Sequence, residues 1–348
     1  MQKTAVILFN LGGPSNLDEV KPFLFNLFND KAIISLPQPF RFLLAKLISH
    51  KRTPKAQNIY KQINNKSPLL DITNIQAESL EKELSFYGEY QVFVNMRYTK
   101  PTALEVVEKI QAYNPTDIVL LPLYPQFSNT TSASSIDNFL ANFKNNNCQT
   151  KIICCYPTES NFIKAHSHLI LAVLQKLKQP ELSKTRLLFS AHGLPQKVIN
   201  AGDPYVYQVE QTVGEIIAHL QNLGYQNLDY QICYQSKVGP LKWTTPSLED
   251  SLRKTALDHK IAVVIPVAFV SDHSETLVEL DIEYKDLASE LGISQYHRVP
   301  SLNLHTDFIN SLAQMVLHTN KHDNKFFCGT SCQKNCPNNL KLCPQNSA

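Results

Sequence analysis

The sequence predicts an α/β fold with two similar domains, each built on a doubly wound, four-stranded parallel sheet. Eight short apolar runs rich in β-branched residues recur along the chain, and each run is nearly continuous instead of alternating with polar residues. This pattern is typical of parallel strands that helices cover on both faces. Helical stretches separate the runs, and the 348 residues exceed the length at which a single hydrophobic core stops growing.

The expected strands divide into two groups of four. A helical stretch at residues 161–178 and a polar, proline-containing segment at 179–185 lie between the groups. We therefore expect one domain at 1–160, a second at 161–306, and a last region, 307–348, whose helix returns to the first domain and whose tail is rich in cysteine. The expected strands are residues 6–10, 92–98, 117–124, 151–156, 186–190, 230–234, 261–270 and 296–300.

Several classes of partner and cofactor are not expected. The formal net charge of +3 is close to balance, and no block of like charge suggests a nucleic-acid-binding arm. The segment after the first strand, 10–16, lacks the spaced glycines of a dinucleotide-binding loop, and no phosphate-binding loop follows elsewhere, so we expect no nucleotide cofactor. The first residues leave no room for a signal peptide, and no apolar run approaches the roughly 20 residues that span a bilayer, so we expect a cytoplasmic protein.

A histidine follows the strand expected at 186–190. Ligands of open parallel sheets bind outside the carboxyl ends of the strands, where this chain has polar clusters, so we expect those clusters to converge on one cleft between the domains. His192 lies at such an end, and the ordinary pKa of an imidazole, about 6.5, lets it take and release protons near neutrality. The alternative is a histidine that only hydrogen-bonds the turn, and the motif alone weights the two equally.

A line of acidic residues follows the strand expected at 261–270. Glu275, Glu279 and Glu283 are four residues apart, so on a helix they would lie along one face. Such oxygen ligands suit a divalent cation or a proton relay, which would account for the repulsion between like charges. The alternative is structural, because Asp272 and Glu275 also fit a capping box at a helix N-terminus, and for Glu283 we prefer a structural role.

Six segments occur in an order and spacing that are specific to one enzyme family. They are 10–14 (Asn-Leu-Gly-Gly-Pro), 96–98 (Met-Arg-Tyr), 121–128 (Leu-Pro-Leu-Tyr-Pro-Gln-Phe-Ser), 190–195 (Ser-Ala-His-Gly-Leu-Pro), 235–240 (Gln-Ser-Lys-Val-Gly-Pro) with Trp243, and 271–277 (Ser-Asp-His-Ser-Glu-Thr-Leu). From about residue 4 to residue 320 the chain resembles the ferrochelatases. The resemblance implies two Rossmann-like, chelatase-like domains with a porphyrin between them. It also implies a lyase that inserts Fe²⁺ into protoporphyrin IX with release of two protons, the last step of haem biosynthesis.

The resemblance also implies roles, residue by residue. The essential histidine of the family matches His192 and its acidic partner matches Glu275, while Glu279 and Asp272 match an acidic metal path beside them. We expect His192 to accept the porphyrin protons, with Glu275 as a relay or as the group that sets the charge of the imidazole. Whether His192 is instead an iron ligand stays open, since neutral imidazole binds Fe²⁺ well. The residues that match the lining or border of the porphyrin pocket are Arg97, Tyr98, Ser128 and Trp243.

Two alternatives to this function stay open at the level of sequence. Related enzymes insert iron into coproporphyrin, or other metals into other tetrapyrroles, and contacts with the propionate groups decide between such substrates. The non-enzymatic alternative is a haem or metal carrier that kept the fold without turnover. The presence of both His192 and Glu275 argues against a carrier.

Half of the eight cysteines, Cys328, Cys332, Cys336 and Cys343, crowd the last 21 residues. Four thiolates are the ligand set of a [2Fe–2S] cluster, and several ferrochelatases carry one near this end, whereas the spacing matches neither a zinc ribbon nor a ferredoxin. We expect a structural or sensory [2Fe–2S] cluster in preference to zinc, and either in preference to free thiols. The animal enzymes place one cluster ligand where this chain has Asn129, so a cluster here is built differently.

The stretch 39–52 combines apolar bulk with basic residues, which is typical of a helix that lies at a membrane surface. In the family this region forms a lip over the porphyrin cleft, and a hydrophobic substrate favours peripheral contact with the inner face of a membrane. The alternative is an ordinary amphipathic helix packed on its own domain, and we weight the two equally.

Overall fold

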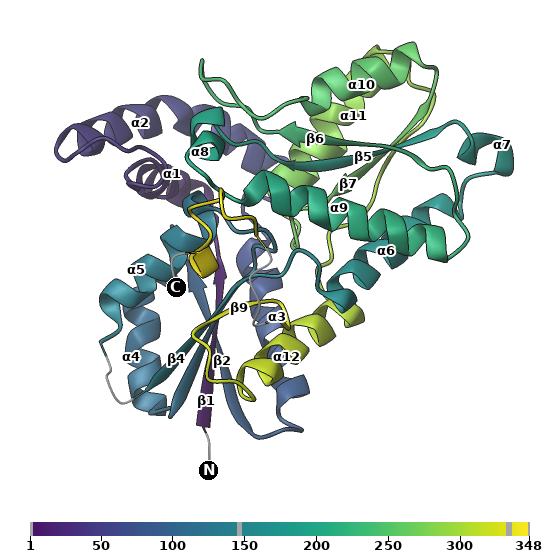
Figure 1. Cartoon of the computed structure of the whole chain (residues 1–348). Coiled ribbons are helices and arrows are strands. Elements are labelled where there is room, and N and C mark those ends of the chain that lie inside the picture. The colour runs from purple at the N-terminus through teal and green to yellow at the C-terminus, as the bar shows by residue number, and fades with distance from the viewer. Residues whose placement is uncertain (1–2, 145–147, 332–335, 347–348) are drawn as a thin grey trace. The chain divides into compact units, whose positions relative to one another are not determined.

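Strands and helices alternate along the chain, which confirms the predicted α/β class (Figure 1). The structure, a computed structural model, describes residues 3–144, 148–331 and 336–346. Its strands form two sheets, one of five strands and one of four.

The chain folds into two compact units. The first comprises Met1–Cys155 and Leu312–Phe327, and the second comprises Tyr156–Ser311 and Cys328–Ala348. The chain passes between the units at three points: after Cys155, inside helix α12 (Thr306–Thr319), and between Phe327 and Cys328. The greater part of α12 therefore belongs to the first unit, and the cysteine-rich tail belongs to the second.

A five-stranded sheet forms the core of the first unit. Its strands are β1 (Lys3–Asn10), β2 (Glu89–Met96), β3 (Asp117–Pro122), β4 (Gln149–Cys155) and β9 (Phe326–Cys328). Their order is β2-β1-β3-β4-β9, and β1 pairs in parallel with both of its neighbours. Residues 5–9 of β1 have no exposed surface, as their continuous apolar sequence predicts for a central strand covered on both faces.

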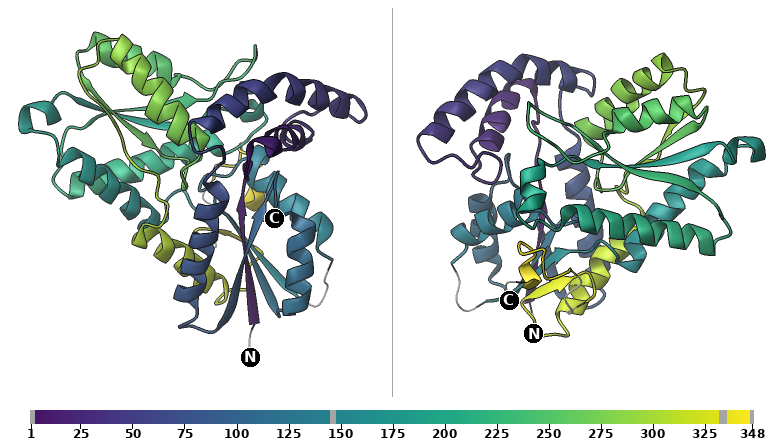
Figure 2. Two further views of the ribbon diagram at one scale, coloured as in Figure 1. Left: turned by 180° about the vertical axis from the view of Figure 1, so that it is seen from behind. Right: turned by 45° about the horizontal axis from the view of Figure 1, so that its top comes forward.

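Helices cover both faces of this sheet. α3 (Leu69–Leu84) lies against one face, and α4 (Ala103–Tyr113) and α5 (Ser134–Asn142) lie against the other (Figure 2). α4 begins at a capping box in which Thr102 and Glu105 exchange side-chain and backbone hydrogen bonds. The sheet and its flanking helices therefore form the three layers expected of a doubly wound domain.

Helix α2 (Phe40–Lys61) covers the stretch that was expected to be interfacial. It packs on α1 (Val20–Phe28) through an edge-to-face aromatic contact, so part of it behaves as an ordinary domain helix. Its Phe40, Leu43 and Leu47 are nevertheless 63, 59 and 51% exposed. Helix α2 thus has both the packing expected of a domain helix and the exposed apolar side chains expected of an interfacial helix. Within the described ranges, no helix has the length and apolar character needed to cross a membrane.

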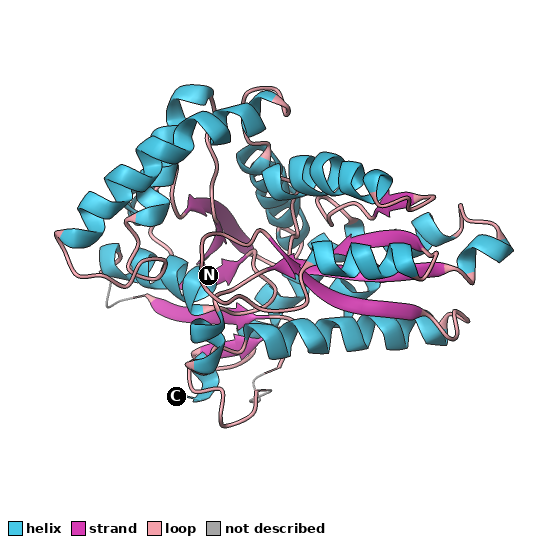
Figure 3. Ribbon diagram, turned by 90° about the horizontal axis from the view of Figure 1, so that it is seen from above, coloured by secondary structure: helices cyan, strands magenta, loops and turns pink. Residues whose placement is uncertain are grey.

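A four-stranded parallel sheet forms the core of the second unit, with helices layered on both of its faces (Figure 3). Its strands are β5 (Thr185–His192), β6 (Asp229–Gln235), β7 (Ile261–Pro266) and β8 (Tyr296–Arg298), in the order β6-β5-β7-β8. The helices are α6 (Ser160–Leu174), α7 (Gln179–Leu182), α8 (Gln196–Asn200), α9 (Tyr205–Asn222), α10 (Leu248–Leu257) and α11 (Tyr284–Glu290). In Figure 1, α6 and α9 lie on one face of this sheet, and α10 and α11 lie on the other.

All eight predicted strands are present, but their ends differ from the predicted ones. β2, β3 and β8 end at Met96, Pro122 and Arg298, each two residues earlier than predicted. β7 ends at Pro266 and not at residue 270, because proline has no N–H with which to continue the ladder. The prediction of four strands in the first sheet is wrong, since β9 adds a fifth next to β4. The apolar run at β9, Phe326–Cys328, has only three residues and is followed directly by Gly329, so the sequence shows no recognisable strand pattern there.

Candidate active site

His192 is the last residue of β5, at the carboxyl end of a central strand. Its register partner is Gln235, the last residue of β6. Nδ1 of His192 lies 2.6 Å from the carbonyl oxygen of Gly193, so we assign the ring proton to Nδ1. One nitrogen therefore hydrogen-bonds the turn, and Nε2 keeps its lone pair for accepting a proton.

The residue after the histidine leaves no room for a side chain. A Cβ atom at Gly193 would lie 3.0 Å from the carbonyl oxygen of Gln235 and 3.2 Å from the ring of Trp243. The Gly193 N–H donates to that same carbonyl at 2.9 Å, and the ring centroids of His192 and Trp243 are 6.4 Å apart. Glycine at this position thus lets the turn that carries the imidazole lie close to the end of β6 and to Trp243.

Glu275 faces His192 beyond the strand ends. Its Oε2 lies 3.8 Å from Nε2 of His192 and 4.0 Å from Nε2 of His273. These distances are longer than hydrogen bonds, and the side chains of His192 and Glu275 are 36% and 27% exposed. A bridging water molecule or a small side-chain rotation is therefore enough to connect the imidazole to the carboxylate.

A second carboxylate, that of Glu279, is held more tightly. Its Oε1 accepts the backbone N–H of Ser236 at 2.9 Å, and its Oε2 accepts the Ser236 hydroxyl at 2.6 Å and the Gln235 amide at 3.2 Å. Burial, and then the negative charge of Glu275, raises the pKa of Glu279 to about 7. Glu279 is therefore about half protonated near neutral pH.

The hydroxyl of Ser236 links the two carboxylates. Its Oγ lies 2.6 Å from Oε2 of Glu279 and 3.2 Å from Oε2 of Glu275. A hydroxyl carries one proton, so it donates to one carboxylate and accepts from the other when that one is protonated. Ser236 has φ 64°, a left-handed conformation that is uncommon outside glycine. The three side chains form a continuous path along which a proton can move.

Gln235 supports this path from β6. Its Oε1 accepts a hydrogen bond from the Ser190 hydroxyl at 2.7 Å. This contact directs the amide nitrogen to the Glu279 carboxylate and to the backbone carbonyl of Glu275, which lies 3.0 Å away. The sequence assigned a role to neither Gln235 nor Ser236. The signal that could have found them is a polar cluster directly after a buried strand.

The acidic segment is a π-helix, η3 (Glu275–Glu283), and not the α-helix on which the predicted line of carboxylates depends. Hydrogen bonds between residues five apart widen each turn, so residues four apart no longer stack in one line. Glu275 and Glu279 still meet at Ser236. Glu283 is exposed, which agrees with the structural role preferred for it.

Asp272 is bound by other partners. Its Oδ1 accepts a hydrogen bond from Arg298 at 3.0 Å, and its Oδ2 accepts one from the side-chain amide of Asn303 at 2.7 Å. Burial raises the pKa of Asp272, but the charge of Arg298 and the hydrogen bonds outweigh burial and hold the pKa below its ordinary value. The predicted capping box of Asp272 and Glu275 is wrong, because Arg298 and Asn303 hold the carboxylate that was expected to cap the helix.

In the first unit, Arg97 and Tyr98, two of the residues predicted to border a porphyrin, contact a carboxylate that the sequence did not single out, that of Asp30. Oδ2 of Asp30 accepts hydrogen bonds from Arg97 at 2.7 Å, from the hydroxyl of Tyr98 at 2.8 Å and from Ser134 at 2.5 Å. Burial raises the pKa of Asp30, but the hydrogen bond from Ser134 and the charge of Arg97 are among the effects that lower it overall. Tyr98 is 2% exposed and the Arg97 side chain 17%, so Arg97 is the more accessible to a ligand.

Ser128 lies before the short π-helix η2 (Asn129–Ala133). Its hydroxyl accepts the backbone N–H of Thr130 at 3.2 Å and contacts the Thr130 hydroxyl at 2.9 Å. The residue is 1% exposed, so its hydroxyl shapes the loop, and its predicted contact with a porphyrin stays a prediction.

Three of the four tail cysteines, Cys328, Cys336 and Cys343, are described, and all three are buried. The fourth, Cys332, lies outside the described residues. A hydrogen bond with Cys336, followed by burial, raises the pKa of Cys343 well above its ordinary value. Gln208 of α9 donates a hydrogen bond to Sγ of Cys336 at 3.2 Å, which anchors the tail to the second unit.

A pocket of about 280 Å³ lies beside these thiols, and Cys328, Cys336 and Gln208 are among the residues that line it. Buried cysteines next to such a space are a suitable environment for a metal cluster ligated by thiolates. The cluster itself stays a prediction, because its fourth expected ligand, Cys332, lies outside the described residues.

Two parallel-sheet units and an imidazole facing carboxylates beyond the strand ends define a chelatase-like α/β protein. Among solved structures, SirB from Bacillus subtilis with Fe³⁺ is similar, with a TM-score of 0.52 and 12% sequence identity. The match covers 92% of this chain and 96% of that chain. At this identity the likeness concerns the fold, and it confirms the predicted fold class.

Sequence comparison gives the family. The model of the Ferrochelatase family matches residues 3–320. Ferrochelatases of Rickettsia bellii (strain OSU 85-389) and Pelagibacter ubique (strain HTCC1062) are each 48% identical to this chain over 98% of its length, which is 95% and 98% of their own lengths. The chain belongs to the ferrochelatase family.

Proposed function

We propose that the protein is a ferrochelatase that inserts Fe²⁺ into protoporphyrin IX, with release of two protons, as the last step of haem biosynthesis. Family membership supports the reaction. The structural observation that carries it is the imidazole of His192, whose Nε2 lies 3.8 Å from Glu275 at the carboxyl end of a parallel sheet. Ligands of open α/β sheets bind at that end.

Metal insertion into a free-base porphyrin requires the protein to accept protons from the ring. Two pyrrole N–H bonds break as the iron forms bonds to the four nitrogens, so two protons leave the centre of the ring in each turnover. Nε2 of His192 takes them one at a time, because the ring proton on Nδ1 is held by the Gly193 carbonyl. Binding energy from the rest of the macrocycle stabilises the bent ring, whose nitrogens are then accessible.

The imidazolium must lose its proton before the next transfer. Glu275 accepts it, and Ser236 connects Glu275 to Glu279. The pKa of Glu279, about 7, suits a group that takes up and releases a proton near neutral pH. We assign His192 as the proton acceptor in preference to an iron ligand, because the carboxylate beside it stabilises the charged imidazolium. Asp272, held by Arg298, takes no part in the proposed path.

The test is anaerobic mixing of the purified protein with Fe²⁺ and protoporphyrin IX, followed by visible absorption. His192→Ala should lower kcat by about 10² to 10⁴, the range of a lost general base. His259→Asn is the control, because His259 is exposed and its φ of 52° is one that asparagine tolerates. Undiminished turnover in His192→Ala removes the mechanism, and porphyrin binding without turnover in the wild type indicates a carrier. Faster turnover of coproporphyrin in a parallel assay would replace the assigned substrate.

We further propose that Arg97, Tyr98, Ser128 and Trp243 contribute to porphyrin binding, as the family resemblance implies. The Arg97 side chain is 17% exposed, and the charge of its guanidinium suits a propionate group. Arg97→Ala should therefore raise the KM for porphyrin more than it lowers kcat. Arg253→Ala, which removes an exposed arginine on α10, is the control. An unchanged KM in Arg97→Ala would exclude this contact.

We propose that Cys328, Cys332, Cys336 and Cys343 hold a structural [2Fe–2S] cluster. The burial of the three described cysteines and the adjacent pocket support it. When bound, such a cluster links distant parts of the tail and absorbs between roughly 300 and 600 nm. Anaerobically purified protein should show these bands, and Cys336→Ser should lose them while Cys148→Ser keeps them. A colourless, zinc-containing wild type would contradict this proposal.

We also propose that the protein works in the cytoplasm, with peripheral contact to the inner face of the membrane through α2. The exposed Phe40, Leu43 and Leu47 supply apolar surface for such contact. Sedimentation with anionic lipid vesicles measures it, and Leu43→Glu with Leu47→Glu should reduce binding. Leu257→Glu is the control, because Leu257 is an 80% exposed apolar residue on another helix. Equal sedimentation of all three proteins would exclude a specific role for α2.

A further inference from the structure

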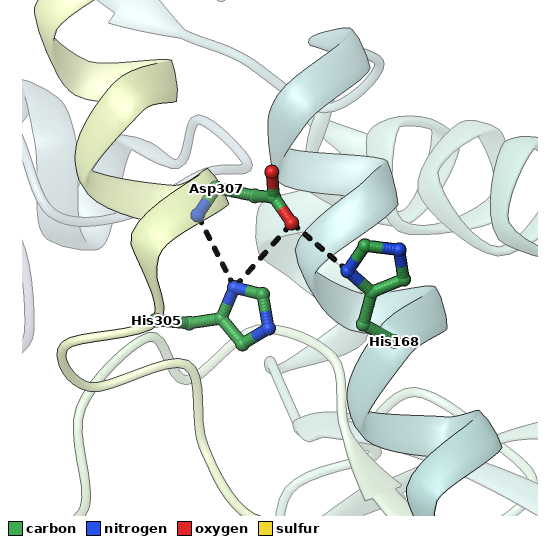
Figure 4. Close-up of side chains that lie close together, drawn as sticks. All are labelled: His168, His305 and Asp307. Carbon is green, nitrogen blue, oxygen red and sulfur yellow. Dashed lines mark hydrogen bonds and ion pairs between the residues drawn. The ribbon is translucent and has the colours of Figure 1, made fainter.

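A group of side chains with the ligand atoms to hold a metal ion lies in the second unit, separate from the residues of the proposed reaction. It comprises His168 on α6, and His305 and Asp307 at the start of α12. Among the described residues, this is the group of three histidine, cysteine or acidic side chains whose ligand atoms all lie within 4.8 Å of one another. Figure 4 shows the carboxylate of Asp307 directed toward both imidazole rings.

The distances suit a single ion. Oδ2 of Asp307 lies 2.9 Å from Nδ1 of His168 and 3.7 Å from Nδ1 of His305. With metal–nitrogen bonds of about 2.0–2.1 Å, neighbouring ligand atoms of a tetrahedral site are about 3.3 Å apart. The two observed distances lie on either side of that value, and the ligand atoms of the two histidines are at most 4.8 Å apart, so rotations of the side chains can place all three atoms around one ion.

The group is also accessible from solvent. The side chains of His168, His305 and Asp307 are 42, 22 and 17% exposed. A hydrated ion can therefore reach the three ligand atoms, and water can fill the coordination positions that the protein leaves open. A fully enclosed site would require the chain to open first.

We propose that His168, His305 and Asp307 bind one divalent first-row transition-metal ion, with water completing its coordination. Two imidazoles and one carboxylate are a ligand set typical of Zn²⁺, Co²⁺ or Fe²⁺, whereas Mg²⁺ and Ca²⁺ prefer oxygen ligands alone. The site shares no ligand with His192 or Glu275. It therefore binds metal whether or not the proposed ferrochelatase reaction is correct.

Two neighbouring groups oppose the ion and thereby offer a sharp test. Nζ of Lys164 lies 3.4 Å from Oδ1 of Asp307, and Lys164 precedes His168 by one turn on the same face of α6. The backbone N–H of Asp307 donates to Nδ1 of His305 at 3.3 Å, which competes for the lone pair that the metal needs. Lys164→Gln removes a repelling charge and frees Asp307. Because the lysine is partly exposed, affinity should rise by roughly threefold.

The experiment titrates Co²⁺ into the purified full-length protein without porphyrin, with visible d–d absorption and calorimetry as readouts. His168→Ala and His305→Ala should each bind one Co²⁺ fewer than the wild type, while His192→Ala and the control His259→Asn keep that ion. Thiolate-bound cobalt is distinguished by its charge-transfer bands in the near ultraviolet, which these variants leave unchanged. Lys164→Gln should bind the ion roughly threefold more tightly.

Two results would overturn the proposal. One is equal Co²⁺ stoichiometry in the wild type, His168→Ala and His305→Ala, which would leave the three residues as a hydrogen-bonded cap of α12. The other is Asp307→Asn protein that binds Co²⁺ as tightly as the wild type, which would exclude the Asp307 carboxylate as a ligand. Because no porphyrin is added, failure here is distinguishable from failure of the ferrochelatase assay.

Discussion

Removing the hydroxyl of Ser236 should shift the pH dependence of turnover. Ser236→Gly deletes the donor that contacts both carboxylates, and glycine adopts the φ of 64° without strain. The backbone N–H of residue 236 and the amide of Gln235 still bind Glu279. A hydrogen bond to a charged group contributes about 1.5–3 kcal/mol, and one pKa unit corresponds to about 1.36 kcal/mol. Deprotonated Glu279 loses this stabilisation, so its pKa should rise from about 7 by roughly one to two units.

In the proposed mechanism Glu279 accepts protons in its deprotonated form, so kcat falls on the acid side of its pKa. A rise of one unit lowers the deprotonated fraction at pH 7 from about one half to about one tenth, so kcat at that pH should fall at least about fivefold, because loss of the hydroxyl also interrupts the link between Glu275 and Glu279. Anaerobic kcat from about pH 6 to 9 gives the apparent pKa in each protein. Ser236→Ala also lacks the hydroxyl and should show the same shift. An acid limb that stays in place or moves to lower pH in Ser236→Gly would refute the relay.

Three further predictions concern the same site. Glu275→Gln removes a charge that raises the pKa of Glu279, so the acid limb of kcat should move to lower pH; a move to higher pH would contradict the assigned cause. Gly193→Ala brings a Cβ to 3.0 Å from a backbone carbonyl, so both Tm and kcat should fall, and two unchanged values would show that the turn adapts. In the folded protein Glu279 holds its proton up to about pH 7, against an ordinary pKa of 4.5, so its contribution to stability is full below pH 4.5 and is lost as the pH rises through about 7. Glu279→Gln should therefore reduce the decrease in unfolding free energy between about pH 5 and 8 by about 1–3 kcal/mol in urea titrations, and an equal decrease in both proteins would exclude this linkage.

The strands could be predicted because buried parallel strands are read directly from continuous apolar runs. β3 (Asp117–Pro122) and β7 (Ile261–Pro266) are buried along their whole length. β9 could not be predicted, because its three residues form a strand only where β4 offers an edge. The sequence pattern predicts a strand when the burial of its own side chains determines its conformation. It does not predict a strand whose conformation is determined by pairing with a neighbouring strand.

The site could be predicted in part for a similar reason. His192 and Glu275 follow different strands of one parallel sheet, and the carboxyl ends of such strands meet at one edge. The π-helical geometry of η3 and the left-handed conformation of Ser236 depend on tertiary contacts, so no local sequence signal reports them. The partners of Asp272 and Arg97 were missed for the same reason, since Arg298 and Asp30 are distant from them in the sequence.

The proton-acceptor role of His192 can be measured most directly by chemical rescue. His192→Ala should be nearly inactive in anaerobic iron insertion, and added imidazoles should restore turnover by occupying the space of the missing ring. If the residue acts as a base, the rescued rate should rise with the pKa of the imidazole across a series of similar size, since proton transfer follows Brønsted behaviour. A rescued rate that does not depend on that pKa, or full activity without any imidazole, would contradict proton acceptance by His192.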